Sequence, residues 1–127
     1  MIKTTVARLA LPDDLIRKAE HSSKKSEVWR IYMEYEEDGE FLYQIEEEIP
    51  VPIVRKLLNP RFIELIHVLQ KNNNKSISEI AEILGRSVPN VYRDLSLLAS
   101  YNLVFFRQAG RRKIPILLLK EIKIKYV

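Results

Sequence analysis

Hydrogen-bonding and basic side chains gather in two short stretches of the second half of the sequence. The first stretch mixes short polar, aromatic and basic residues, and comprises Ser87, Val88, Pro89, Asn90, Tyr92 and Arg93. The second is basic and comprises Arg107, Arg111, Arg112 and Lys113. An asparagine can form paired hydrogen bonds with adenine and an arginine with guanine, whereas clustered cations bind phosphates. These residue types indicate nucleic-acid contact if the fold brings both stretches to one surface.

Both stretches also have a purely structural alternative. Arg93 could form a surface ion pair with Asp94 or Glu82, and such pairs contribute little to stability. The basic stretch could be nothing more than a solvated turn. Both alternatives stay open at the level of the sequence.

Catalytic and metal-binding chemistry has little support elsewhere in the chain. There is no cysteine, and the two histidines, His21 and His67, are too few for a multi-histidine metal site. The acidic run 46–48 would lie on a strand, where neighbouring side chains alternate between faces, so we expect it to be solvated. Neither a glycine-rich phosphate loop nor a nucleophile with its base can be assembled. We therefore expect no enzyme activity, no metal and no cofactor.

Charge divides the 127 residues into two unequal halves. Up to Pro50 there are seven Lys or Arg against twelve Asp or Glu, a net charge of −5, and from Val51 onward there are fourteen against five, a net charge of +9. A basic half with an acidic companion suggests a polyanion partner for one part and a different role for the other. We expect residues 1–50 to be an acidic N-terminal α/β extension used for dimerisation or partner binding. No apolar run is long enough to span a membrane, and we expect a cytoplasmic protein.

The N-terminal half has the pattern of a strand, a helix and a hairpin. The pattern predicts a strand over residues 2–9 and a helix from about 12 to 21. Apolar residues of one parity from Trp29 to Tyr35 and from Phe41 to Ile45 predict a hairpin with a three-residue loop over 37–39. Pro50 and Pro52 then indicate a linker.

Three helices and several strands are expected in the second half. Asn59-Pro60 caps a helix that runs to about Lys71, and a second helix opens at Ser76 or Ser78 and ends at Gly85. A third helix runs from Ser87 to about Asn102 and buries Val91, Leu95 and Leu98. We expect a strand over 104–108, a turn over 109–113, an apolar run from Ile114 and a strand at the C-terminus.

Two short helices joined by Gly85-Arg86-Ser87 and followed by a hairpin with a basic tip are typical of a winged helix-turn-helix. The sequence therefore predicts an α+β fold, with a winged helix-turn-helix DNA-binding domain over residues 51–127 and a small strand-helix-hairpin extension before it. In this fold the third helix is the recognition helix and the basic hairpin is the wing.

Residues 78–95, SEIAEILGRSVPNVYRDL, with Leu97-Leu98 and Asn102-Leu103-Val104, resemble winged-helix transcriptional regulators of the MarR and ArsR type. The NVYRDL segment at 90–95 and the ending from Ile114-Pro115 to Ile124 are similar to MarR-like predicted regulators common in archaea. The resemblance covers about residues 59–127. Asn102 stands where that group usually has glycine, and residues 116–119 are more apolar than its usual ending.

The expected function follows from the fold, the residue types and the resemblance together. We expect a sequence-specific regulator of transcription that binds double-stranded DNA as a homodimer, through the recognition helix and the wing named above. The two-fold interface would use the hairpin aromatics or the apolar run 116–119. The alternative is a winged-helix module that binds protein in a transcription or antitoxin complex, because the fold alone does not establish DNA binding.

Overall fold

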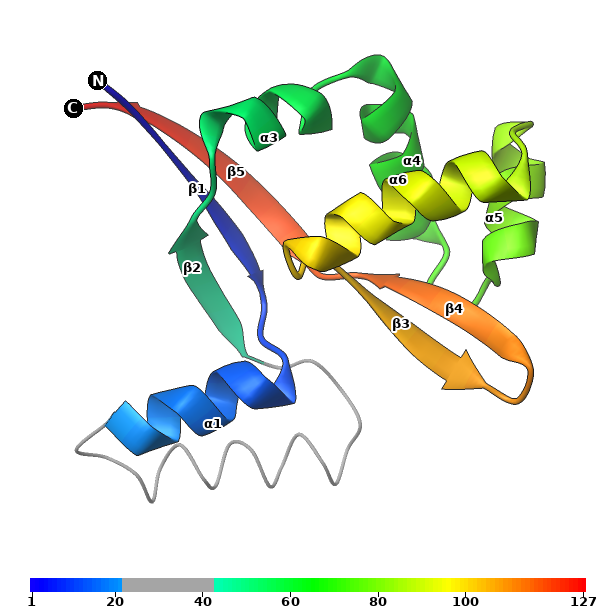
Figure 1. Cartoon of the computed structure of the whole chain (residues 1–127), viewed down its shortest axis with the longest axis horizontal. Helices are drawn as coiled ribbons and strands as arrows, with labels where there is room; N and C mark the ends of the chain where they lie inside the picture. The colour runs from blue at the N-terminus through cyan, green and yellow to red at the C-terminus, as the bar shows by residue number, and fades with distance from the viewer. Residues whose placement is uncertain (22–42) are drawn as a thin grey trace.

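The computed structural model describes residues 1–21 and 43–127, which form an α+β fold with two small antiparallel sheets. In chain order the elements are β1 (Ile2–Leu9), α1 (Pro12–His21), β2 (Gln44–Glu48), α3 (Val51–Leu57), α4 (Pro60–Lys71), α5 (Ile77–Leu84), α6 (Val88–Ser100), β3 (Val104–Ala109), β4 (Arg112–Leu117) and β5 (Leu119–Tyr126). Figure 1 shows the three-stranded sheet on the left, the β3–β4 hairpin at the lower right, and α4, α5 and α6 above that hairpin. The predicted α+β class is confirmed.

The three-stranded sheet joins the two ends of the chain. Its order is β2-β1-β5, and both pairings are antiparallel. Ile2 lies opposite Tyr126 and Val6 opposite Ile122, so the predicted first and last strands are confirmed and pair with each other. The division at residues 50 and 51 stays a prediction, but β1 shares a sheet with β5 from the other side of that division.

The predicted hairpin lies mostly outside the described residues, including its apolar positions from Trp29 to Tyr35 and its loop over 37–39. The part that is described, β2, contains Ile45 and pairs with β1, with Leu9 opposite Gln44. The edge of β1 that β5 leaves free is therefore occupied by β2.

The linker expected around Pro50 and Pro52 is wrong, because α3 begins there. Pro50 is the N-cap of α3, with φ −59° and ψ 140°, and Pro52 lies in the first turn. First-turn N–H groups have no acceptor within the helix, so a proline loses no hydrogen bond at this position. Ile53, Val54 and Leu57 then bury one face of the helix. The two prolines start a helix instead of separating two units.

Side-chain caps define the starts of the next helices. The Asn59 side chain accepts a hydrogen bond from the backbone N–H of Arg61, as the Asn-Pro pair predicts. At α5 the capping box joins Ser76 and Glu79, which decides between the two serines that the sequence allowed. Ser87 caps α6 by accepting a hydrogen bond from the backbone N–H of Asn90. These caps set the directions in which α4, α5 and α6 leave their loops.

Left-handed residues end two of these helices. Gly85 follows α5 with φ 65°, a conformation in which a glycine avoids the steric cost of a Cβ. Asn102 follows α6 with φ 57°, and is the only described residue other than glycine with positive φ. Both positions were predicted, although α6 itself ends at Ser100.

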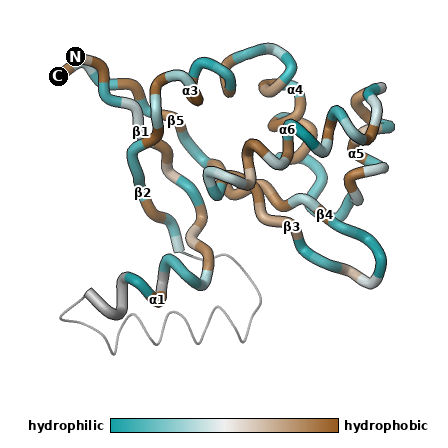
Figure 2. Tube along the Cα trace, in the orientation of Figure 1, coloured by the Kyte–Doolittle hydropathy of each residue, from teal (hydrophilic) through white to brown (hydrophobic). Residues whose placement is uncertain are grey.

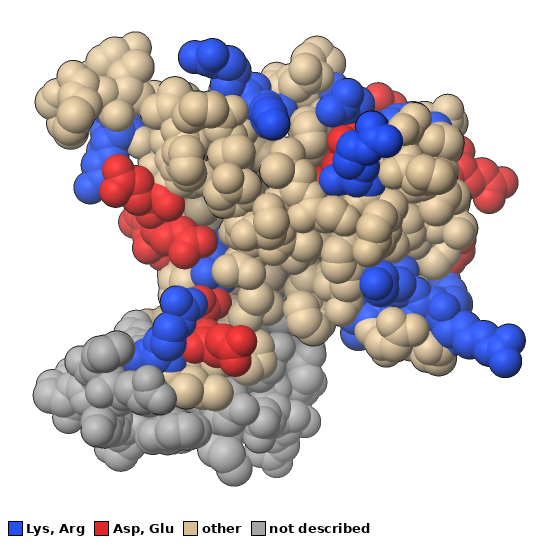
Figure 3. Space-filling model, in the orientation of Figure 1, with Lys and Arg blue, Asp and Glu red and all other residues tan. Residues whose placement is uncertain are grey.

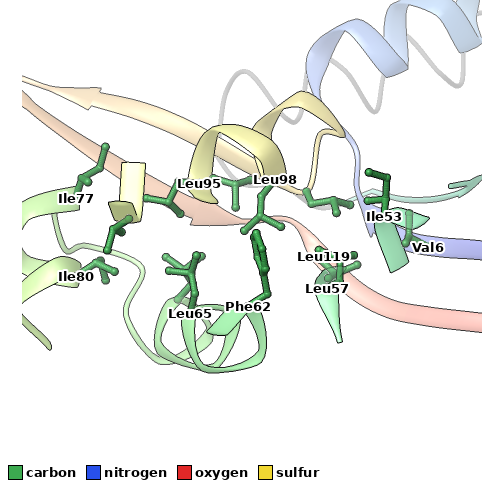
Figure 4. Packing of buried hydrophobic residues seen from close by; sticks show 14 of the residues in the cluster. Val6, Ile53, Leu57, Phe62, Leu65, Ile77, Ile80, Leu95, Leu98 and Leu119 are labelled. Carbon is green, nitrogen blue, oxygen red and sulfur yellow. The ribbon is translucent and has the colours of Figure 1, made fainter. Parts of the chain in front are cut away.

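The core lies between the helices and the sheets, and Figure 4 shows its packing. Phe62 and Leu65 of α4 face Leu95 and Leu98 of α6, and all four are almost fully buried. Val6 of β1 and Leu119 of β5 belong to the same cluster. The predicted buried stripe of the third helix is thereby confirmed.

The apolar run 116–119 belongs largely to this chain's own interior. Leu118 is fully buried, Leu119 is 8% exposed, and Ile116 and Leu117 are half-buried. Two of its four side chains are therefore not available as an exposed surface for a second copy.

The β3–β4 hairpin has a tighter turn than the sequence indicated. Ala109 pairs with Arg112, so that the loop is the two residues Gly110 and Arg111 instead of the predicted 109–113. Gly110 has φ 63°, which two-residue hairpin loops require at their first position. The short loop brings the basic residues of the hairpin close together at its tip.

No helix in the described part of the chain is long and apolar enough to cross a membrane.

Candidate nucleic-acid interface

The first two turns of α6 present their polar residues to solvent. Val91, Leu95 and Leu98 face the core together with the buried Asp94, whereas Tyr92 and Arg93 are exposed. All six predicted recognition residues are exposed: Ser87, Val88, Pro89, Asn90, Tyr92 and Arg93. The helical period thus separates the apolar stripe from the candidate contact residues, as predicted.

The predicted wing residues lie on the β3–β4 hairpin. Arg107, Arg111, Arg112 and Lys113 are all exposed. Figure 3 shows Lys and Arg atoms gathered at the tip of this hairpin, and Figure 2 shows that the tip is hydrophilic. The hairpin therefore carries a basic surface next to α6.

An aromatic contact joins the hairpin to α6. The Tyr92 and Phe106 rings stack with centroids 6.1 Å apart. The ammonium group of Lys113 lies 5.7 Å from the centre of the Tyr92 ring and 5.4 Å from that of Phe106. Tyr92 was predicted to contact DNA, but one side of its ring packs on the hairpin. The main consequence of the Tyr92–Phe106 contact is that Lys113 is held beside α6.

Arg112 connects the hairpin to α5 and to the loop before it. Its guanidinium donates hydrogen bonds to the Glu79 carboxylate and, at 3.4 Å, to the carbonyl oxygen of Asn74. The backbone N–H and the hydroxyl of Ser76 and the guanidinium of Arg112 together lower the pKa of Glu79 to about 2. Arg112 is 52% exposed, but its charge is already paired. We therefore distinguish it from the other three basic residues of the hairpin.

A buried aspartate organises the other side of α6. Asp94 is 5% exposed, and its Oδ2 accepts a hydrogen bond from Arg86 Nη2 at 2.5 Å. The same oxygen forms an ion pair with Arg61, whose Nε lies 3.0 Å away. These two arginines occupy Asp94, and among the described residues Arg93 forms no ion pair with it or with Glu82. The surface bridge that the sequence left open is therefore absent from this part of the chain. Arg93 extends from α6 as an exposed cation.

The sequence interpretation missed Asp94 and its partners. Position 94 lies three residues after Val91 and directly before Leu95, so the helical period already placed it beside the buried stripe. A charged residue at such a position must be paired, which would have suggested a search for basic partners. The loop residue Arg86 and the first-turn residue Arg61 come from different elements and could not have been assigned by spacing.

A second charged cluster links β1, α1 and β2. Arg8 is fully buried, and it donates two hydrogen bonds to Asp14, at 2.8 and 3.0 Å, and two to Glu47, at 2.7 and 3.3 Å. Although burial alone would raise it, the Arg8 hydrogen bonds and the N–H of Leu11 lower the pKa of Asp14 overall. The acidic run 46–48 does alternate between faces, but Glu47 is part of this cluster instead of being solvated.

The described residues offer no group of three His, Cys, Asp or Glu side chains that could hold a metal ion. His67 is exposed on α4, and the side chain of His21 is not among those described.

The search of curated proteins found no match to this chain. A protein-family comparison matched residues 57–124 to the family HVO_A0114. The matched region begins at the last residue of α3 and includes α4, α5, α6, the β3–β4 hairpin and most of β5. It contains every predicted contact residue and covers more than half of the chain, and this protein therefore belongs to the HVO_A0114 family.

Proposed function

We propose that this protein is a sequence-specific, double-stranded DNA-binding regulator of transcription with a MarR-like winged helix-turn-helix. In this proposal α5, the turn at residues 85–87 and α6 are the helix-turn-helix, and the β3–β4 hairpin is the wing. One observation carries the proposal: the exposed polar turns of α6 lie beside a basic hairpin, and the Tyr92–Phe106 contact holds the two together.

Each candidate residue has a role that fits its surroundings. Asn90 and Arg93 are exposed on α6 and would contact base edges in the major groove. Arg107 and Arg111 are exposed on the hairpin and would contact phosphates or the minor groove. Lys113 would contact a phosphate close to α6. Ser87 caps α6 and could donate its hydroxyl hydrogen to a phosphate at the same time.

We propose further that the protein binds as a homodimer in the cytoplasm. Two recognition helices related by a two-fold axis would enter major-groove faces about 34 Å apart, and the site would be an inverted repeat. Light scattering at working concentration should return twice the mass of one chain. A mass of one chain would overturn this part of the proposal.

The function is tested by selecting bound sequences from random duplex DNA. We expect enrichment of an inverted repeat, and affinity for the selected duplex should fall steeply with salt because bound cations displace counterions. The matched control is Ser96→Ala, which lies on α6 three residues after the last candidate contact, Arg93, and should select the same sequence. Arg93→Ala should select a more degenerate one.

If no sequence is enriched and binding does not depend on salt, the proposal fails and the protein-binding alternative becomes the better account. One surface favours that alternative: Leu58 and Ile63 are about half exposed and border a groove of about 360 Å³ between α4 and β5. A winged-helix interaction module in a transcription or antitoxin complex would use such an apolar surface. The selection experiment therefore decides between the two functions.

A further inference from the structure

Four basic side chains surround Asp94 on the side of α6 that faces α4. Two recesses share Arg61, Arg93 and Asp94 in their walls. The smaller, of about 190 Å³, is also lined by Arg86 and Asn90. The larger, of about 430 Å³, extends to Lys56 at the end of α3. We call the two recesses together the α4–α6 recess.

The charges of the α4–α6 recess do not balance. Asp94 is the only acidic residue among its lining residues, against Lys56, Arg61, Arg86 and Arg93. Asp94 pairs with Arg61 and Arg86 through a single oxygen, and the buried Arg86 Nη1 has no hydrogen-bond partner among residues 1–21 and 43–127. The recess thus retains a net positive charge of about three and has more donors than acceptors. Its chemistry suits an anion.

Two of these basic side chains are exposed enough to contact a ligand without any rearrangement of the fold. Arg61 has 56% of its side chain exposed although its Nε contacts Asp94, which leaves other guanidinium N–H groups free to donate. Lys56 is exposed and forms no ion pair within the described residues. Asp94, by contrast, is buried and holds the Arg61 guanidinium at the wall of the recess. Asp94 is therefore a positioning residue, and Lys56 and Arg61 are the candidate contacts.

The recess and the hairpin lie on opposite flanks of the exposed turns of α6. Tyr92 contacts the hairpin through Phe106, whereas the neighbouring Arg93 and Asn90 line the recess. In Figure 3 Lys and Arg atoms gather both at the hairpin tip and, separately, over the region where α4 and α6 meet. A helix in a major groove has a phosphate backbone on each side, so cations on both flanks are what a duplex requires.

We propose that the α4–α6 recess binds a backbone phosphate of duplex DNA, with Lys56 and Arg61 as the contacts and Asp94 holding Arg61 in place. This inference rests on the proposed function. It adds a second phosphate-binding surface to the hairpin, on the strand that borders the other side of the major groove. It also gives a role to the buried carboxylate of Asp94 on α6.

The test compares the salt dependence of three proteins on one duplex. The double variant Lys56→Gln with Arg61→Gln removes two phosphate contacts from each protomer, so the slope of log K against log salt should shrink by about 1.8 per protomer. Affinity should fall by a similar factor on selected and random duplexes, because phosphate contacts carry no sequence information. The matched control is Arg55→Gln, an exposed residue of α3 that lines neither recess, and its slope should equal that of the wild type.

A duplex with one neutral methylphosphonate linkage locates the contact. Placed at the phosphate that faces the recess, it should weaken wild-type binding but leave the double variant unchanged. Thermal unfolding of the double variant should stay close to that of the wild type, because both side chains are exposed. A scan of linkages that weakens both proteins equally at every position overturns the proposal.

Other outcomes separate this inference from the proposed function. If the wild-type slope is steep and the double variant has the same slope, the recess does not bind a phosphate. DNA binding by the protein would still stand. If Arg55→Gln lowers the slope as much as the double variant does, the recess proposal is also overturned. The loss of any surface cation would then explain the effect. Inorganic phosphate that binds the wild type and not the double variant, and leaves duplex binding unchanged at matched ionic strength, assigns the recess to a free anion and overturns the backbone contact. If the wild type binds no duplex, both the proposed function and the recess proposal are overturned.

Discussion

Two buried aspartates, Asp14 and Asp94, each pair with two arginines, but the two clusters differ in charge balance. At Asp14 the partners are Arg8, at 2.8 Å, and Arg17, at 2.7 Å, and Glu47 supplies a second carboxylate to Arg8. The cluster has two cations and two anions. At Asp94 one carboxylate faces two paired arginines and two further cations in the recess.

The difference indicates different roles. A balanced and buried cluster satisfies its own members and fixes β1, α1 and β2 relative to one another. An unbalanced cluster at the surface keeps donors available and raises the local positive potential. The first is a structural cluster, and the second suits an external anion. The net charge that a cluster retains after its ion pairs are counted, more than the number of those pairs, distinguishes a stabilising network from a binding surface.

The largest effect should come from breaking the balanced cluster. Arg8→Ala leaves Asp14 buried without its main partner, and we expect the free energy of unfolding to fall by about 3–5 kcal/mol. Urea denaturation measures this change. The matched control is Arg17→Ala, which removes a partner of the same Asp14 from a side chain that is 67% exposed, and should cost no more than about 1 kcal/mol. Equal losses in the two variants would show that burial does not set the strength of the cluster.

The next effect concerns base contact by α6. Arg93→Ala should weaken binding to the selected duplex by about 1–3 kcal/mol and relax its sequence preference, while binding to random DNA changes less. Competition assays with selected and random duplexes measure the difference. The stability of the fold should be unchanged, because Arg93 forms no ion pair within the described residues. A uniform loss on both duplexes would instead place Arg93 on a phosphate.

A smaller effect separates two neighbouring arginines of the hairpin. The sequence alone predicts that Arg111→Ala with Arg112→Ala lowers the salt slope by about 2, one for each phosphate contact. Because Arg112 is paired with Glu79, we now expect Arg111→Ala to lower the slope by about 0.9 and Arg112→Ala to lower it less. Slopes from the two single variants test this order, and equal slopes would show that the Glu79 pair opens on DNA.

The smallest effect is on the pH dependence of stability. The pKa of Glu79 falls from 4.5 to about 2 on folding, so its contribution is present above pH 4.5 and is lost as the pH falls toward 2. Glu79→Gln removes the ionised partner of Arg112 and of the α5 cap. The stability difference between wild type and this variant should therefore grow between pH 2 and pH 4.5 and stay constant above. A difference that does not change with pH would assign the loss to packing.

Local signals in the sequence predicted most of the helices and strands of the second half. The Asn59 and Ser87 caps, the left-handed residue Gly85 and the buried stripe of α6 depend on neighbouring residues only, and all are confirmed. The α3 helix was missed because two prolines indicate a break unless the apolar spacing after them is weighed.

Contacts between distant elements could not be predicted in this way. The pairing of β1 with β5 joins residues more than one hundred positions apart, and period-two patterns do not identify the partner strand. The Arg8 and Asp94 clusters likewise join different elements, so that spacing along the chain could not reveal them. The exposure of the candidate contact residues of α6 could be predicted, because they are the positions that the buried stripe leaves free.

The salt dependence of binding to the selected duplex tests the central claim most directly. About five cations per chain are assigned to phosphates, namely Lys56, Arg61, Arg107, Arg111 and Lys113, which predicts a slope of log K against log salt steeper than about −4 for each protomer. Balanced clusters such as that of Asp14 contribute nothing to this slope. A slope of about −4.5 per protomer would support the account, and a slope near zero, or the absence of any preferred duplex, would contradict it.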